Sequence, residues 1–230
     1  MTTNPTLGPA TGLNVLHLFC HASADVDAAV VHRAVDAATA KGVQVITAAI
    51  MGAKADLCFL ALAPNLWDLR AFQTSLQHAG LLVAESYVSV TEVSEYAAGM
   101  PEAMLQARLY PQLPPEGMTA FCFYPMSKRR GDEHNWFALP YEERDALMRG
   151  HGKSGREFKG RVLQLVTGST GLDDWEWGVT LFGVHVDDLK DCVYTMRFDE
   201  ASTLYGEFGA FYTGMIGSVD EVLAATVPQA

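Results

Sequence analysis

Apolar residues recur along the first half of the chain in two different rhythms. Four short runs are continuously apolar or alternate with polar residues, as in strands: residues 13–20, 43–51, 57–63 and 81–93. Between them, apolar residues stand three and four positions apart, which predicts helices with one buried face: residues 25–41 (Ala28, Val31, Val35, Ala38) and the segment after Pro64 (Leu69, Phe72, Leu76, Ala79). Asn65 suits the start of the second helix, and Gly42 and Gly80 suit the two helix ends. The order β-α-β-β-α-β predicts a ferredoxin-like unit.

The same order returns in the second half of the chain. Strands are expected at residues 120–124, 161–167, 178–186 and 208–216, and helices at 140–154 and 187–196. The second of these helices has an apolar stripe of Leu189, Cys192, Val193 and Met196. We therefore expect an α+β fold in which two ferredoxin-like halves merge their sheets into one barrel-type subunit. The expected parts are a flexible tail (1–12), an N-terminal lobe (13–109), a proline-rich linker (110–118) and a C-terminal lobe (119–230).

Composition excludes several classes of protein. The chain has 230 residues, of which 49% are hydrophobic, so it is long enough to bury a sizeable core. The longest apolar run, residues 57–63, is too short to cross a bilayer, and residues 1–12 have no signal-peptide pattern. We expect a cytoplasmic protein with no membrane association. The four cysteines, Cys20, Cys58, Cys122 and Cys192, form no CxxC pair, which predicts buried, reduced thiols rather than a zinc site or disulfides.

One segment inverts the charge of the chain. The net charge is −11, yet residues 128–161 contain nine Lys/Arg against six Asp/Glu. A local basic patch on an acidic protein favours a small polyanionic ligand and argues against a nucleic-acid surface, which usually spreads basic charge more widely. Lys128, Arg129 and Arg130 either form a solvated turn or bind carboxylates of such a ligand.

Three further residues near or within this segment have a structural and a chemical interpretation. His151 follows Leu147 on a helical face and precedes Gly152 and Gly155, so it is either a core histidine or a haem-iron ligand beside a helix surface that a flat macrocycle can approach. Tyr124 and Trp136 are either core aromatics or redox-active residues.

Two strands add to this picture. Phe121 and Phe123 should share one face of their strand, leaving Tyr124 on the other. Gln164 is the one polar residue of 162–166, and it either forms a structural hydrogen bond or lines a pocket.

Several motifs occur in a characteristic order: YPMSKRR at 124–130, NWF at 135–137, HGKSGREF at 151–158, TGSTGLDDWEW at 167–177 and MRFDEAS at 196–202. Together they resemble the coproheme decarboxylases, the haem-synthesis branch of the chlorite dismutase superfamily, and most closely its Firmicutes-type members. The resemblance is strong over about residues 105–217 and covers the N-terminal half only through its element order.

The resemblance implies a homopentamer that converts iron coproporphyrin III to haem b with hydrogen peroxide, and coproporphyrin ferrochelatase as a possible partner. It implies His151 as the iron ligand, Tyr124 as the radical-forming residue and Lys128 as the holder of the reacting propionate. The porphyrin pocket would be lined by Arg108, Tyr124, Pro125, Met126, Ser127, Lys128, Trp136, Gln164, Arg197 and Ser202.

Two other activities stay open. A chlorite dismutase would carry a distal arginine where Gln164 stands, which disfavours chlorite chemistry. A non-catalytic haem carrier or sensor would need His151 and the pocket but neither Tyr124 nor Lys128.

Overall fold

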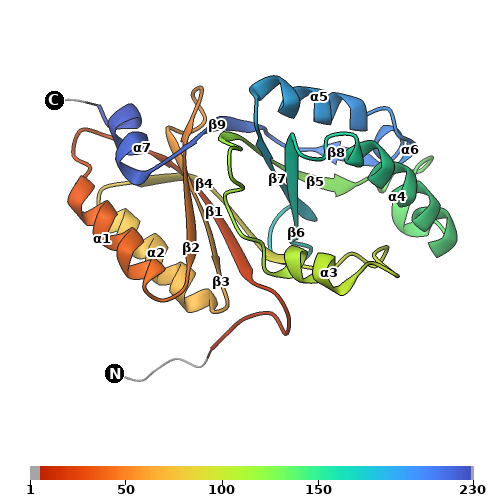
Figure 1. Cartoon of the computed structure of the whole chain (residues 1–230), viewed down its shortest axis with the longest axis horizontal. Coiled ribbons are helices and arrows are strands. Elements are labelled where there is room, and N and C mark those ends of the chain that lie inside the picture. Colours follow the sequence, from red (N-terminus) through yellow and green to blue (C-terminus); the bar gives the residue numbers. More distant parts are fainter. Residues whose placement is uncertain (1–5, 229–230) are drawn as a thin grey trace.

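The structure is a computed structural model, and it describes residues 6–228 (Figure 1). The N-terminal lobe contains β1 (Asn14–His21), α1 (Ala28–Thr39), β2 (Gln44–Ile50), β3 (Leu57–Ala63), α2 (Leu66–His78) and β4 (Leu82–Thr91). Its strands are antiparallel and lie in the order β4-β1-β3-β2, the order of a ferredoxin-like unit. Asn65 caps α2 as predicted, because its side chain accepts a hydrogen bond from the Trp67 amide.

The C-terminal lobe repeats this arrangement. It contains β5 (Ala120–Lys128), α4 (Tyr141–Arg156), β6 (Val162–Gly168), β7 (Trp177–Gly183), α5 (Val186–Met196), β8 (Gly206–Phe208) and β9 (Tyr212–Gly217). The strands follow the order β9-β5-β7-β6, so β9, β5, β7 and β6 correspond to β4, β1, β3 and β2.

The single strand expected at 208–216 is wrong in detail, because β8 and β9 pair with the same strand, β5, on either side of an interruption. Met126 pairs with Phe208 and Phe123 with Tyr212, so three residues, 209–211, lie opposite two on β5. Gly209 donates its amide to the Pro125 carbonyl at 2.8 Å, and a Cβ at Gly209 would lie 2.6 Å from the Pro125 ring. This bulge lies directly beside Tyr124.

The two lobes close into one barrel. β2 pairs with β9 and β4 pairs with β6, while the additional pairing of β5 with β7 closes the ring of eight strands within residues 6–228. Gly214 allows the close approach of β9 to β2, since a Cβ there would lie 2.1 Å from the Ala49 carbonyl oxygen. The interior is filled by side chains from both lobes, among them Val15, Phe19, Leu60, Phe121, Phe123 and Phe182. The expected α+β barrel of two ferredoxin-like halves is confirmed.

Helices cover the outer faces of both halves of the barrel (Figure 1). α1 and α2 lie on the N-terminal half, and they are joined there by α7 (Val219–Thr226), a helix that the apolar pattern did not predict. Val222 and Leu223 of α7 are buried in the same core cluster as Leu16 and Leu18, because β9 brings the end of the chain beside β2. In Figure 1 this blue helix lies with the red and orange lobe.

The remaining elements are short. They are α3 (Glu102–Leu109), a 3-10 turn at Trp136–Ala138 and α6 (Glu200–Thr203). Among the described residues, no helix is both long and apolar enough to cross a membrane. All four cysteines are free and buried, as expected.

The expected boundaries of the tail (1–12) and of the linker between the lobes (110–118) are less sharply marked in the structure. Residues 1–5 of the expected tail lie outside the described part of the chain. Leu7 is attached to the start of α2, because its amide donates to Asn65 Oδ1 at 3.1 Å and its carbonyl accepts from the Leu66 amide at 2.8 Å. The division of the lobes at residues 110–118 stays a prediction.

Candidate functional site

One face of β5 carries three of the predicted site residues. Tyr124, Met126 and Lys128 alternate with residues of the opposite face, as the strand period requires. Phe121 and Phe123 fill the barrel, whereas Tyr124 lies in the cluster between the sheet and α5. The sequence-based assignment of the two faces is therefore confirmed.

Tyr124 is buried, with 7% of its surface exposed. Phe211 stacks on its ring with centroids 4.5 Å apart, and Phe208 lies 5.9 Å away. Burial is the main reason why the pKa of Tyr124 is raised well above its usual value, so the phenol keeps its hydrogen at neutral pH. A phenol held in this way can give up a hydrogen atom more readily than a bare proton.

Lys128 is a buried cation at the end of the same strand. Its Nζ donates to the Ala201 carbonyl at 2.9 Å and lies 4.3 Å from the centroid of the Trp136 ring. Burial lowers the pKa of Lys128 to about 8, although the nearby carboxylates of Asp199 and Glu176 act in the opposite direction. An anionic ligand that binds beside Lys128 would stabilise the charged form of this buried side chain.

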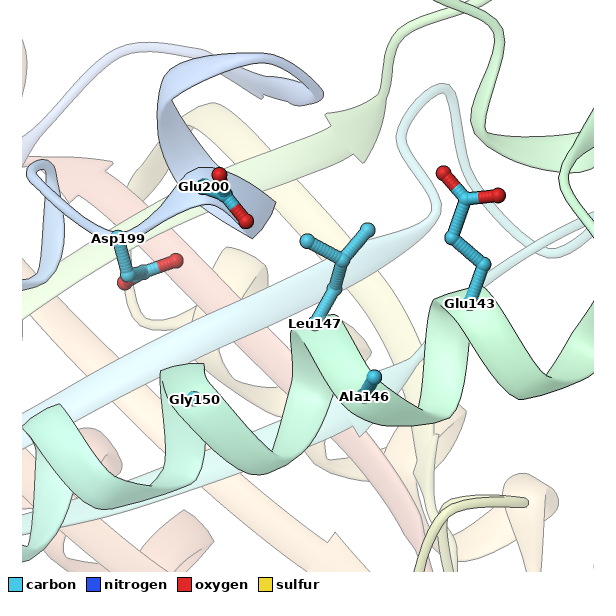
Figure 2. A pocket seen from close by; sticks show the side chains of 6 residues that line it. All are labelled: Glu143, Ala146, Leu147, Gly150, Asp199 and Glu200. Carbon is cyan, nitrogen blue, oxygen red and sulfur yellow. The ribbon is translucent and has the colours of Figure 1, made fainter.

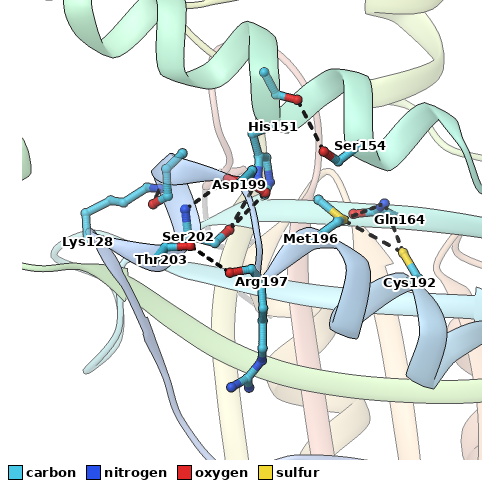
Figure 3. Close-up of polar contacts among 12 residues, drawn as sticks. Lys128, His151, Ser154, Gln164, Cys192, Met196, Arg197, Asp199, Ser202 and Thr203 are labelled. Carbon is cyan, nitrogen blue, oxygen red and sulfur yellow. Dashed lines mark hydrogen bonds and ion pairs between the residues drawn. The ribbon is translucent and has the colours of Figure 1, made fainter.

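His151 lies on α4 and faces the segment between α5 and α6 (Figure 3). Its Nδ1 is 3.0 Å from Asp199 Oδ2 and 3.4 Å from Ser202 Oγ. Burial raises the pKa of Asp199, but hydrogen bonds from His151 and Ser202 outweigh burial and hold this pKa below its usual value. A charged carboxylate therefore accepts the Nδ1 hydrogen, which leaves the Nε2 lone pair of His151 for a metal ion.

Gln164 projects from β6 toward the same region (Figure 3). Its Nε2 lies 3.5 Å from Cys192 Sγ and 3.4 Å from Met196 Sδ, both on α5. Gly155 of α4 comes close to this amide, since a Cβ there would lie 3.2 Å from Gln164 Nε2. The amide thus has structural contacts and also borders the face of α4 that carries His151.

The other predicted site residues differ in how closely they approach Tyr124, Lys128 and His151. Arg197 lies with its guanidinium 4.6 Å from the Phe208 ring, and in Figure 3 it points away from His151. Ser127 Oγ accepts a hydrogen bond from the Glu176 amide at 3.2 Å, and the Pro125 carbonyl is used by the bulge. Arg108 is exposed at the last turn of α3, and no hydrogen bond or ion pair within residues 6–228 links it to the other predicted site residues.

The basic segment, residues 128–161, has fewer cations available for a ligand than its sequence suggests, because carboxylates neutralise five of its arginines. The pairs are Arg129–Glu207, Arg130–Glu176, Arg144–Glu95, Arg149–Asp145 and Arg161–Asp188. Charge counting along the chain could not show this, since four of the five partners are far away in sequence.

Two carboxylates at the site were missed by the sequence analysis. Asp199 positions His151, and the buried Glu176 accepts hydrogen bonds from the Lys128 amide and from Arg130. Glu176 lies in the motif at 167–177 and Asp199 in the motif at 196–202. The presence of an acidic residue within these motifs was the signal that could have identified both.

A cavity of about 280 Å³ lies beside Asp199 (Figure 2). It lies between α4 and α6 and is lined by Glu143, Ala146, Leu147, Gly150, Asp199 and Glu200. None of the predicted site residues lines it, but it borders the site through Asp199 and through Gly150, the neighbour of His151 on α4.

The residues fit an iron porphyrin that bears carboxylates. His151 offers a nitrogen ligand whose second nitrogen is held by a carboxylate, which is the usual setting of a metal-bound histidine. Gly150 and Gly152 leave space beside α4, whereas Gly155 already lies against the side chains of Gln164 and Met196. No residue of this helix is fully buried by the rest of the described chain. Lys128 supplies a buried cation for a carboxylate.

Comparisons with known proteins agree with this fit. The coproheme decarboxylase of Staphylococcus saprophyticus is 44% identical over 183 residues, which are 75% of this chain and 73% of that protein. A structure described as a novel heme-binding protein from Thermus thermophilus matches with a TM-score of 0.85 at 34% identity, over 96% of both chains. A chlorite dismutase from Candidatus Nitrospira defluvii, solved in complex with imidazole, has a TM-score of 0.76 over 94% of this chain and 95% of its own, and its 22% identity supports the fold alone. The chlorite dismutase family model matches residues 22–217, so the chain belongs to the chlorite dismutase family.

Proposed function

We propose that this protein is a coproheme decarboxylase, which uses hydrogen peroxide to convert two propionates of iron coproporphyrin III to vinyl groups and so forms haem b. One observation carries the proposal: a buried phenol, Tyr124, and a buried lysine, Lys128, share one face of β5. Lys128 contacts Ala201, in the short segment that also holds Asp199, the partner of His151. A redox-capable group, a carboxylate-binding cation and a metal ligand are thus combined, as this reaction requires.

Each residue has a role that follows from its setting. His151 binds iron through Nε2, while Asp199 keeps the imidazole oriented and electron-rich. Lys128 pairs with the reacting propionate, and Trp136 beside it shapes that end of the pocket. We assign Arg108, Pro125, Met126, Ser127, Gln164, Arg197 and Ser202 to the lining of the porphyrin site or to contacts with the other propionates.

Tyr124 carries the chemical step. When bound, the iron porphyrin supplies both the substrate carboxylates and the centre at which peroxide delivers its oxidising equivalents. Tyr124 loses its phenolic hydrogen and then takes a hydrogen atom from the propionate methylene next to the macrocycle. The propionate loses that hydrogen atom, one further electron and carbon dioxide, and one peroxide is reduced to two waters. Two such rounds convert two propionates.

Two alternatives use the same fold. A non-catalytic haem carrier is favoured by the Thermus thermophilus relative, which is described as a heme-binding protein, but a carrier gives no reason for a buried phenol and a buried lysine on one face of the same strand. Chlorite dismutation is disfavoured by Gln164, which stands where we expect the arginine of that branch and whose amide is held by two sulfur atoms.

The proposed reaction has a setting in haem synthesis. We infer a cytoplasmic homopentamer that receives iron coproporphyrin III from a ferrochelatase that inserts iron into coproporphyrin. The relationship to the coproheme decarboxylase of Staphylococcus saprophyticus supports this setting.

The test is anaerobic loading with iron coproporphyrin III followed by stepwise addition of peroxide, with mass detection of the porphyrin. The parent protein should lose two molecules of carbon dioxide per porphyrin and consume two of peroxide. Tyr124→Phe should bind the porphyrin equally well, because the ring packing is kept, and should bleach it with little loss of carbon dioxide. Tyr212→Phe is the matched control, since this buried tyrosine faces the barrel interior. Conversion at the parent rate by Tyr124→Phe would refute the assigned role, and porphyrin binding without any decarboxylation by the parent would favour the carrier.

A further inference from the structure

Three oxidisable rings lead from the site to the surface. Trp136 is buried and lies 6.3 Å from Tyr96 between ring centroids, and Tyr96 is stacked on Tyr141 at 5.8 Å. Tyr96 is half-buried, and Tyr141 is 41% exposed. The inner end borders the propionate site, because Lys128 Nζ is 4.3 Å from the Trp136 ring. The series therefore runs from a buried ring at the site to an exposed ring on the first turn of α4.

The surroundings of Tyr124 are different. The two aromatic rings that pack against Tyr124 within the described residues are Phe208 and Phe211, and phenylalanine is far harder to oxidise than tyrosine or tryptophan. An oxidising equivalent on Tyr124 is thus insulated from neighbouring rings. An oxidising equivalent that reaches Trp136 has two oxidisable neighbours, the buried Tyr205 at 5.4 Å and Tyr96 at 6.3 Å, and Tyr96 leads on to the exposed Tyr141.

We propose that Trp136, Tyr96 and Tyr141 form an escape route that carries oxidising equivalents away from the porphyrin site when no propionate consumes them. This proposal rests on the proposed function, which supplies the oxidant: an iron porphyrin treated with peroxide. Trp136 gives one electron to the site and recovers it from Tyr96, which in turn recovers it from Tyr141. The phenolic proton of Tyr141 goes to water, and an exposed phenoxyl radical remains that a cellular thiol or ascorbate can reduce.

The charges near these rings favour movement of the oxidising equivalent outward, from Trp136 to Tyr141. The Lys128 ammonium disfavours a lasting positive charge on Trp136, whereas a tyrosine that loses both an electron and its proton becomes a neutral radical. Arg144 Nε donates to Tyr96 Oη at 2.9 Å, and burial, as the main cause, raises the pKa of Tyr96 to about 12. Tyr96 therefore keeps its proton unless it is oxidised, and Tyr141, which is exposed, has water beside it to accept a proton once it is oxidised.

The experiment maps where the radical ends. The protein is loaded with haem b, which keeps the iron porphyrin but lacks the two propionates that react, and binding is verified by absorption. A few equivalents of peroxide are added with a nitrone spin trap, and adducts are located by peptide mass spectrometry. Tyr141 should carry several-fold more adduct than Tyr194 on α5. Tyr194 is the internal control, because it is 62% exposed and a freely diffusing oxidant would label it at least as strongly.

Two variants separate a route from mere exposure. Tyr96→Phe should reduce the adduct on Tyr141 several-fold although Tyr141 is still present, and Tyr141→Phe should move the adduct inward to Tyr96. In both variants the porphyrin should bleach faster than in the parent, and Tyr194→Phe should change nothing.

Each other outcome has a definite meaning. Equal labelling of Tyr141 and Tyr194, or a Tyr141 adduct that persists in Tyr96→Phe, would overturn the route. If the parent decarboxylates iron coproporphyrin III while Tyr141 stays unlabelled with haem b, the route fails and the proposed function stands. If the protein binds no iron porphyrin, both fail together.

Discussion

His17 should make the barrel unstable in acid. This residue of β1 has no exposed surface, and its ring lies 4.3 Å from that of Phe123. Its Nε2 is 2.9 Å from Thr180 Oγ1 on β7, and its Nδ1 has no hydrogen-bond partner among the described residues. Burial lowers the pKa of His17 from 6.5 to about 3, because a charged imidazole would have neither water nor a carboxylate beside it.

The sign and size of the effect follow from proton linkage. Between the unfolded pKa of 6.5 and the folded pKa of about 3, the unfolded chain binds a proton at His17 that the folded chain does not. Stability is therefore complete above the unfolded pKa and falls as the pH decreases through this window. On going from about pH 7.5 to about pH 4.5, His17 alone should remove about 2.7 kcal/mol, which is two pKa units at about 1.36 kcal/mol each.

The assay compares the parent with the double variant His17→Phe/Thr180→Val. Replacing both partners with apolar groups avoids a stranded hydroxyl, so the variant should be close to the parent in stability at neutral pH. Urea unfolding followed by tryptophan fluorescence, at one protein concentration and both pH values, gives two free-energy differences. The parent should lose about 2.7 kcal/mol more than the variant between these pH values, since all other titrating groups are shared. An equal loss in both proteins would show that His17 is not held neutral in the folded barrel, and the reasoning would be wrong.

Four further variants have expected outcomes. His151→Ala should lose the ferric spectrum of a histidine ligand while keeping the parent's melting temperature, and an unchanged spectrum would require another ligand. Asp199→Asn should keep the histidine ligand but shift the reduction potential of the iron upward. Lys128→Ala should weaken binding of iron coproporphyrin III more than binding of haem b, and equal losses for both ligands at two salt concentrations would count against a propionate contact. In the parent, binding of iron coproporphyrin III should weaken as the pH rises through about 8, where Lys128 loses its charge. Gly214→Ala should lower the melting temperature sharply, because its Cβ would lie 2.1 Å from the Ala49 carbonyl, and a melting temperature equal to the parent's would show that β2 and β9 can separate without cost.

Local sequence patterns determined the elements and the faces they present. The period of two in residues 120–124 was sufficient to place Phe123 and Tyr124 on opposite faces of the strand, because neighbouring side chains of a strand must point in opposite directions. The structure shows that the face of Phe123 is the one inside the barrel. The cap at Asn65 could be predicted for the same local reason, since it depends only on the next few residues. The motifs around Tyr124 and His151 likewise indicated the family before any geometry was known.

Contacts between distant residues were decided only by the tertiary structure. His151 meets Asp199 across 48 positions of the chain, and no pattern in either segment specifies that meeting. The bulge that lays Phe211 on Tyr124 depends on how β8 and β9 pair with β5, and α7 joins the other lobe only because β9 lies beside β2. Periodicity records which face of an element is buried but not which partner covers it, so the barrel's closure, the pairing of its arginines and the surroundings of its titratable groups had to come from the packed chain.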